Sequence, residues 1–162
     1  MVDVTYQMVL STLQTVGLLV GIFYYITTLR NQNKARQTQL YMQIANKFGD
    51  SEQLEARNKY DTYDWLNAED LVKDFSSLEG RKTIGLLGCY YESLGILVKE
   101  GLLDIRIVSL FMTSIVIRFW DKLKPFIGEM RELTGWQRAF IETEYLYYEL
   151  MKYYKEHPEL AT

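Results

Sequence analysis

The clearest pattern in the chain is an uncharged, mostly apolar stretch from Val4 to Leu29. A helix needs about 20 residues to cross roughly 30 Å of hydrocarbon, and Tyr6–Leu29 exceeds that length. The stretch therefore predicts one transmembrane helix. A buried core helix and a signal sequence are the alternatives, although no basic residue precedes the stretch and no small-residue cleavage site follows it.

Apolar residues at helical spacing and turn residues between them predict helices along the rest of the chain. The first helix is expected to continue past the apolar stretch as an amphipathic helix to Gly49. Further helices are predicted at Asp50 or Ser51 to about Trp65, 68–75, about Ser77 to Lys99, Ile105 to Lys124, Pro125 to Leu133, and Gly135 or Trp136 to about Glu156. The expected start signals are Asn67, Ser76 with Glu79, and Asp104, and Gly101 is expected to end a helix.

No alternation of apolar and polar residues indicates strands. The predicted fold class is all-α, with one N-terminal transmembrane helix continuing into a bundle of about five to six helices. Residues 1–36 form the anchor with its basic stripe and residues 37–162 form the helical domain. A second span is not expected, because Ile107–Ile117 is too short and Thr83–Val98 contains Glu92.

The charges predict an orientation. All 18 Lys and Arg residues, and every Asp and Glu of 21 except Asp3, follow the apolar stretch. Arg30, Lys34 and Arg36 lie directly after it, and basic flanks stay on the cytoplasmic side. We expect a single-pass protein of the cell membrane, with its N-terminus outside and its C-terminal domain in the cytoplasm. The interspersed signs argue against nucleic acid as a partner.

Glu92 and Arg118 each lie within a strongly apolar predicted helix. If the helices on either side of Gly101 form an antiparallel hairpin, the two side chains come within one to two turns of each other. We predict that they form a core ion pair that sets the helix register. The alternatives are a polar functional site within the bundle, or exposure of one of the two to solvent.

Catalytic motifs are scarce. His157 is the only histidine and is followed by Pro158, and Cys89 is expected to be a small buried side chain. Gly85, Gly88 and Gly95 lie in a helical pattern, so we expect them to allow close helix packing instead of binding phosphate. No cofactor, metal site or catalytic residue is predicted.

Two patterns indicate association with another protein or a second copy of the chain. Gly17 and Gly21 have the small-xxx-small spacing that lets two membrane helices approach closely, although this spacing also occurs by chance. In the last helix, Trp136, Phe140, Tyr147, Met151 and Tyr154 are expected to face the core. Three tyrosines lie off that face and are possible interface residues: Tyr145, Tyr148 and Tyr153.

Three segments carry a resemblance to a known family: LRNQNKARQTQLYMQ, YYESLGILVKEGLLD and IRFWDKLKP. With them, residues 15–130 resemble small prokaryotic membrane-anchored proteins grouped as a domain of unknown function. The most specific positions are Glu92, Gly95, Lys99, Gly101, Leu102, Arg118, Trp120 and Pro125. The resemblance implies one span and an all-helical cytoplasmic domain, and implies no activity.

Two classes of function fit these features. The first is a non-catalytic, membrane-anchored interaction or scaffold protein, as an accessory subunit of a membrane complex or as a homo-oligomer. Its partners are the lipid bilayer and another membrane protein or itself. The alternative is a membrane-tethered sensor or enzyme with a site near Glu92 and Arg118.

Overall fold

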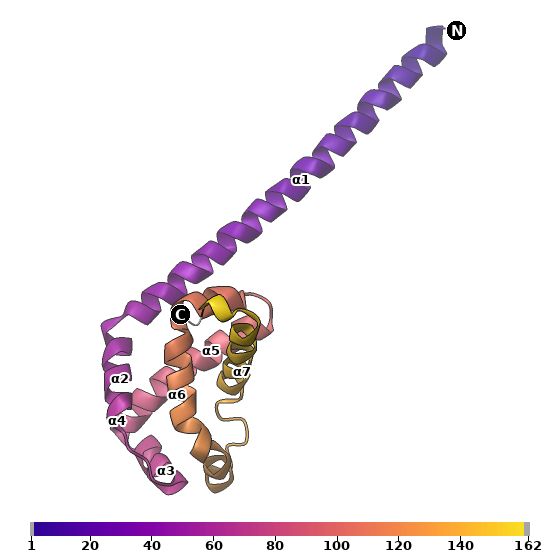
Figure 1. Cartoon of the computed structure of the whole chain (residues 1–162). Coiled ribbons are helices and arrows are strands. Elements are labelled where there is room, and N and C mark those ends of the chain that lie inside the picture. The colour runs from indigo at the N-terminus through magenta and orange to yellow at the C-terminus, as the bar shows by residue number, and fades with distance from the viewer. Residues whose placement is uncertain (1, 161–162) are drawn as a thin grey trace. The chain divides into compact units, whose positions relative to one another are not determined.

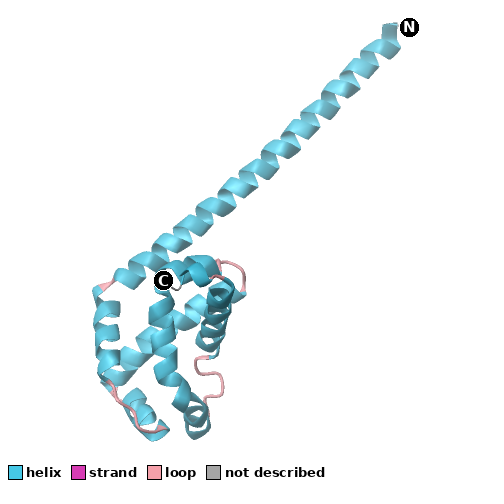
Figure 2. Cartoon of the chain, in the orientation of Figure 1, coloured by secondary structure: helices cyan, strands magenta, loops and turns pink. Residues whose placement is uncertain are grey.

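The computed structural model describes residues 2–160, and every regular element among them is a helix (Figures 1 and 2). The predicted all-α class is confirmed, with one long apolar N-terminal helix followed by a helical domain. The chain divides into two compact units, Met1–Met42 and Gln43–Thr162. The boundary predicted at residue 36 came from charge and stays a prediction.

Helix α1 runs from Val2 to Gly49 and ends at the predicted glycine. It contains a window with a mean hydropathy of 1.7, long and apolar enough to cross a membrane, and none of that window is buried. Hydroxyl groups within the stretch donate to carbonyl oxygens of the preceding turn, as in Thr12 to Met8 at 2.8 Å and Thr15 to Ser11 at 2.8 Å. These polar residues of the first half therefore satisfy their hydrogen bonds within the helix.

Five helical segments follow. They are α2 (Ser51–Thr62), α3 (Ala68–Ser76), α4 (Leu78–Gly80), the π-helical segment η1 (Arg81–Gly85) and α5 (Leu86–Lys99). Short polar side chains cap two of them, α3 and α4. Asn67 caps α3 as predicted, since its Oδ1 accepts from the Asp70 amide at 2.9 Å. The cap of α4 is Ser77, which accepts from the Gly80 amide, and not Ser76.

The boundaries of the last two helices differ from the prediction. Helix α6 runs from Ile105 to Thr134 through Pro125, so the predicted end at Lys124 is wrong. Proline costs about 3 kcal/mol in a helix interior, but Ile127 and Met130 beyond it are buried on the same core, which offsets that cost. Gly135, at φ 71°, ends the helix in the left-handed region.

Helix α7 (Ile141–Glu156) begins later than predicted, because turns connect it to α6, and a 3-10 turn (Pro158–Leu160) follows it. Its buried face is formed by Thr143, Leu146, Tyr147 and Leu150. The predicted core face is therefore partly wrong, since Trp136 and Met151 are exposed while Phe140 and Tyr147 are buried.

Glycine allows α5 to pack closely on α7 (Figure 1). A Cβ at Gly95 would lie 2.1 Å from the Glu142 carbonyl oxygen, and one at Gly88 would lie 2.2 Å from the Phe140 ring. The predicted close packing is confirmed at these two glycines. It is wrong at Gly85, where a Cβ would meet nothing within 4 Å.

Candidate functional site

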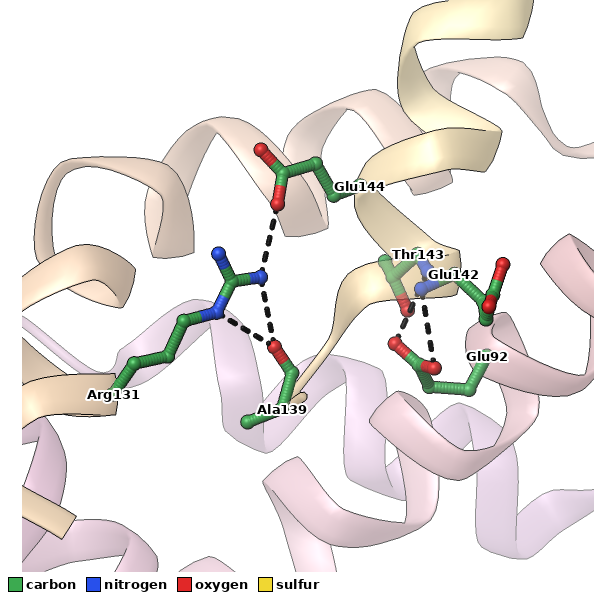
Figure 3. A network of polar contacts seen from close by, with 6 residues as sticks. All are labelled: Glu92, Arg131, Ala139, Glu142, Thr143 and Glu144. Carbon is green, nitrogen blue, oxygen red and sulfur yellow. Dashed lines mark hydrogen bonds and ion pairs between the residues drawn. The ribbon is translucent and has the colours of Figure 1, made fainter. Parts of the chain in front are cut away.

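Glu92 and Arg118 do not pair, so the predicted core ion pair is wrong. Glu92 lies on the face of α5 that packs on α7, where its carboxylate accepts from the Glu142 amide at 3.2 Å and the Thr143 amide at 3.1 Å (Figure 3). Arg118 has a side chain 60% exposed, and its Nη2 lies 3.5 Å from Asp61 Oδ2. Helix α5 presents Glu92 to α7 and not to α6, so the two side chains do not meet.

Glu92 caps helix α7 from a neighbouring helix. The first amides of a helix have no partner within it and carry partial positive charge. Phe140, which precedes α7 at φ 59°, offers no side-chain acceptor. The Glu92 carboxylate takes that place, and Lys99 pairs with Glu142 beside it at 2.9 Å. This explains a charged residue within an apolar helix without any catalytic role.

Arg131 holds the connection that leads into α7. Its Nε and Nη2 donate to the Ala139 carbonyl oxygen at 3.0 and 2.9 Å, and Nη2 also pairs with Glu144 at 2.9 Å (Figure 3). Glu92 and Arg131 together fix the start of α7 from two sides (Figure 3). Both charged groups therefore stabilise the start of α7.

Lys122 does the same at the C-terminal end of α2. Its Nζ donates to the carbonyl oxygens of Tyr60 at 2.9 Å and Asp61 at 3.1 Å, and it lies over the rings of Tyr60 and Trp65. Partial burial lowers the pKa of Lys122, against the opposing effect of Asp61. A lysine with a lowered pKa is a candidate for chemistry, but here helix capping uses its donors.

A small concavity between α2, α5 and α6 differs from these capping sites. We call it the notch, and its lining includes Arg57, Tyr60, Asp61, Tyr91, Arg118 and Phe119. Within the part of the chain that the structure describes, two buried donor atoms of the notch, Arg57 Nη1 and Tyr91 Oη, have no partner in hydrogen-bonding geometry. Burial raises the pKa of Tyr91 to about 12, although the guanidinium groups of Arg57 and Arg118 act to lower it, that of Arg57 partly as a donor close to the hydroxyl.

Sequence reasoning reached only one side chain of the notch, Arg118. Arg57 and Asp61 are four residues apart on α2, a spacing that also suits an ordinary surface ion pair. Tyr91 is one of 13 tyrosines and nothing local distinguishes it from the others. The notch exists only because three helices meet there.

The other predicted candidates lie apart from the notch. Cys89 is exposed, so the prediction of a buried thiol is wrong. His157 pairs with Glu159 at 3.0 Å. Among the described residues, no group of three His, Cys, Asp or Glu side chains is arranged to hold a metal ion.

An open groove of about 450 Å³ lies between α2 and the π-helical segment. Its charged lining residues are of both signs, and Lys59 and Glu79 pair across it at 2.9 Å. Three glutamates and two lysines line the groove, so its net charge is too small to select a ligand.

The residues predicted for membrane association and orientation are accessible on α1. A Cβ added at Gly17 or Gly21 would meet nothing within 4 Å, so both positions are open to a second helix. Arg30, Lys34 and Arg36 are exposed. The roles of these residues in association and orientation stay predictions.

The three tyrosines predicted for an interface differ in exposure. Tyr148 is half exposed, whereas Tyr145 and Tyr153 are partly buried. Lys99 lies over the Tyr145 ring, and the Tyr153 ring packs on His157. The rings of Tyr145 and Tyr153 therefore already contact other side chains of this chain. The interface role of the three tyrosines stays a prediction.

An exposed apolar surface that the sequence did not indicate lies on α6. Leu110 and Phe111 are 66% and 44% exposed, and the Phe111 ring contacts Phe48 at 4.9 Å between centroids. On a helix, Ile107, Leu110 and Phe111 share one face with Arg118. We call Ile107, Leu110 and Phe111 the α6 apolar row. It begins near the end of α1 and leads along the helix toward the notch.

Comparison with known proteins finds a family for this chain. No curated protein and no solved structure matches it. One family model matches residues 11–150, which is most of the chain, and it is described as a domain of unknown function, DUF4760. The match begins within the apolar part of α1 and ends within α7. The chain therefore belongs to the DUF4760 family.

Proposed function

We propose that this protein is a single-pass, membrane-anchored interaction module without catalytic activity, of the kind found in small prokaryotic membrane proteins. The observation that carries the proposal is the α6 apolar row, which exposes large apolar side chains on a helix whose other face is core. Contiguous exposed apolar surface is typical of a binding site for another protein.

The apolar part of α1 supports the membrane anchor. Its hydroxyl groups are satisfied by backbone carbonyl oxygens, so no polar group of Thr12 or Thr15 needs water. The family match covers this stretch together with the helical domain, which favours a permanent part of the protein over a removable signal. The basic residues Arg30, Lys34 and Arg36 favour a cytoplasmic C-terminal domain.

The charged side chains support a non-catalytic role. Glu92, Arg131 and Lys122, the best internal candidates for acid, base or electrophile, are bonded to the ends of helices. A general base needs an accessible lone pair within hydrogen-bond reach of its substrate. These side chains bond to backbone groups instead, which favours a structural role for them.

The partner is another membrane-associated protein or a second copy of the chain. The experiment is purification of the full-length protein from its own membranes in a mild detergent, followed by measurement of the mass of the complex. We expect a stoichiometric complex with the wild type and its loss with Leu110→Glu. Leu66→Glu is the matched control, because Leu66 is also exposed and lies outside the α6 apolar row.

If the wild-type protein purifies as a monomer with no bound partner, the interaction role is contradicted. Gly17→Ile and Gly21→Ile test the contribution of the anchor in the same assay, because a bulky side chain prevents close approach of a second helix. Labelling of cysteines introduced on either side of the apolar stretch tests the orientation: access to the C-terminal domain from outside the cell would overturn it.

A further inference from the structure

The notch presents hydrogen-bond donors that have no acceptor. Arg57 Nη1 and Tyr91 Oη both line it, both are buried, and neither has a partner in hydrogen-bonding geometry among the described residues. A buried donor without an acceptor has lost its bonds to water and gained none in return, and this loss is greater when the group is charged. The Arg57 guanidinium lies near the Tyr91 hydroxyl, but the two do not meet in good hydrogen-bond geometry. An acceptor atom that is not part of the chain would satisfy both donors better than they satisfy each other.

The donors are held rigidly. The Nη2 of Arg57 donates to the Phe48 carbonyl oxygen at 3.0 Å, and its guanidinium lies 4.1 Å above the Phe48 ring. Tyr91 is fully buried, and its ring packs on Phe119 at 4.8 Å between centroids. Neither side chain is free to turn toward another partner. Groups fixed in this way bind with little loss of conformational entropy.

The charge of the notch is positive. Two guanidinium groups, those of Arg57 and Arg118, face one carboxylate, that of Asp61. The contact between Arg118 and Asp61 is long, at 3.5 Å, and both side chains are exposed. An exposed pair of this kind is weak, so Arg118 can turn to a stronger anion at the mouth of the notch.

The size of the notch limits the ligand. Its volume is about 10 Å³, which accommodates a single oxygen atom, and it is open to solvent on one side. An anion therefore inserts one oxygen and keeps the others at the mouth. Arg57, Tyr91 and Arg118 approach from three helices, so a tetrahedral anion offers each donor an oxygen whereas a planar carboxylate offers two in all.

We propose that the notch binds a phosphate group. One phosphate oxygen enters the notch and accepts from Arg57 Nη1 and Tyr91 Oη, while Arg118 leaves Asp61 and pairs with the outer oxygens. The phosphate belongs to a small soluble compound or to a lipid headgroup. This site does not depend on the α6 apolar row or on the proposed protein partner.

The test is thermal unfolding of the full-length protein in a neutral detergent, followed by tryptophan fluorescence. Inorganic phosphate is titrated against sodium chloride of equal ionic strength, and sodium acetate serves as the carboxylate probe. We expect phosphate to raise the melting temperature with a saturable dependence, because it binds the folded state only. No rise above that in chloride, or an equal rise in acetate, would overturn the proposal.

Variants locate the site. Arg118→Gln is expected to raise the phosphate concentration needed for half-saturation about ten-fold or more, because it removes a charged donor. Arg106→Gln is the matched control, since Arg106 is an exposed arginine of the same helix and does not line the notch. Asp61→Asn is expected to tighten binding by removing the competing carboxylate. An equal response of Arg118→Gln and Arg106→Gln would refute the assignment.

Tyr91→Phe tests the interior of the notch, because it removes only the hydroxyl and keeps the ring packing. The phosphate concentration at half-saturation is expected to rise several-fold. Unchanged binding would exclude the notch as the phosphate site. Two further probes separate the sources of phosphate. If glycerol 3-phosphate binds as tightly as short-chain phosphatidic acid, the natural ligand is a soluble compound. If phosphatidic acid binds more tightly, the ligand is a lipid headgroup. In either case Arg118→Gln is required to weaken the binding of both compounds.

Discussion

Replacement of Gly95 by alanine is expected to separate α5 from α7. The added Cβ would lie 2.1 Å from the Glu142 carbonyl oxygen and 2.6 Å from the carbonyl carbon. Both are backbone atoms, so no side chain can turn away to make room. Ordinary contact requires the two helices to move apart by roughly 1 Å, which a close-packed interior resists.

The cost follows from three contributions. The overpacking of a core by one methyl group destabilises by about 1–3 kcal/mol. The same movement stretches the bonds from the Glu142 and Thr143 amides to Glu92, already at 3.2 and 3.1 Å, and a hydrogen bond to a charged group contributes about 1.5–3 kcal/mol. Alanine returns about 0.5–1 kcal/mol through its helix propensity. We expect a net loss of about 2–4 kcal/mol in the free energy of unfolding.

Gly85→Ala is the matched control, because a Cβ at that position would meet nothing within 4 Å. It is expected to stabilise the protein by about 0.5–1 kcal/mol, since alanine favours helix more than glycine does. The assay is urea unfolding of the full-length chain in a non-denaturing detergent. Trp65, Trp120 and Trp136 report on residues 43–162 by fluorescence. If Gly95→Ala were as stable as Gly85→Ala, the close packing of α5 on α7 would be refuted.

Three further changes test the polar network, the proline and a buried tyrosine. Glu92→Gln is expected to lower the free energy of unfolding in urea by about 1–3 kcal/mol, because it weakens the cap of α7. Glu142→Gln loses only the pair with Lys99 and should cost less than about 1 kcal/mol. Equal losses would contradict the cap. Pro125→Ala should stabilise by about 1–3 kcal/mol, because it restores a donor to a helix interior, and a loss of stability would refute this. Because the pKa of Tyr91 is raised to about 12, its contribution to stability is complete below about pH 10 and is lost as the pH rises from 10 to 12. Tyr91→Phe should therefore reduce the fall in unfolding free energy over that range by about 1.4 kcal/mol per pH unit, and an unchanged slope would contradict the burial of this hydroxyl.

Local signals predicted most of the fold. Asn67 and Asp104 begin helices because each side chain bonds an amide two or three residues along the chain. Gly101, at φ 66°, adopts the left-handed conformation expected of it. The continuous uncharged stretch predicted a long helix to Gly49. In each case the interacting atoms are close in the sequence, so the sequence carries the information directly.

The predictions failed where a distant partner decided the outcome. Pro125 is a helix breaker in isolation, and burial of Ile127 and Met130 carries α6 past it. Glu92 required a partner, but nothing near it in the sequence identified the amides of Glu142 and Thr143, some 50 residues away. A pattern of residue types shows that a buried charge needs a counterpart and does not identify it.

The sequence by itself determined that the protein is all-α, that an apolar helix precedes a charged helical domain, and where most helices begin. Only the tertiary structure decided which charges cap helix ends, which face of α6 stays exposed, and that Arg57, Tyr91 and Arg118 meet at one notch. The physical reason is the range of the interactions. Helix formation and capping act over one or two turns, whereas the notch depends on three helices packed around a common core.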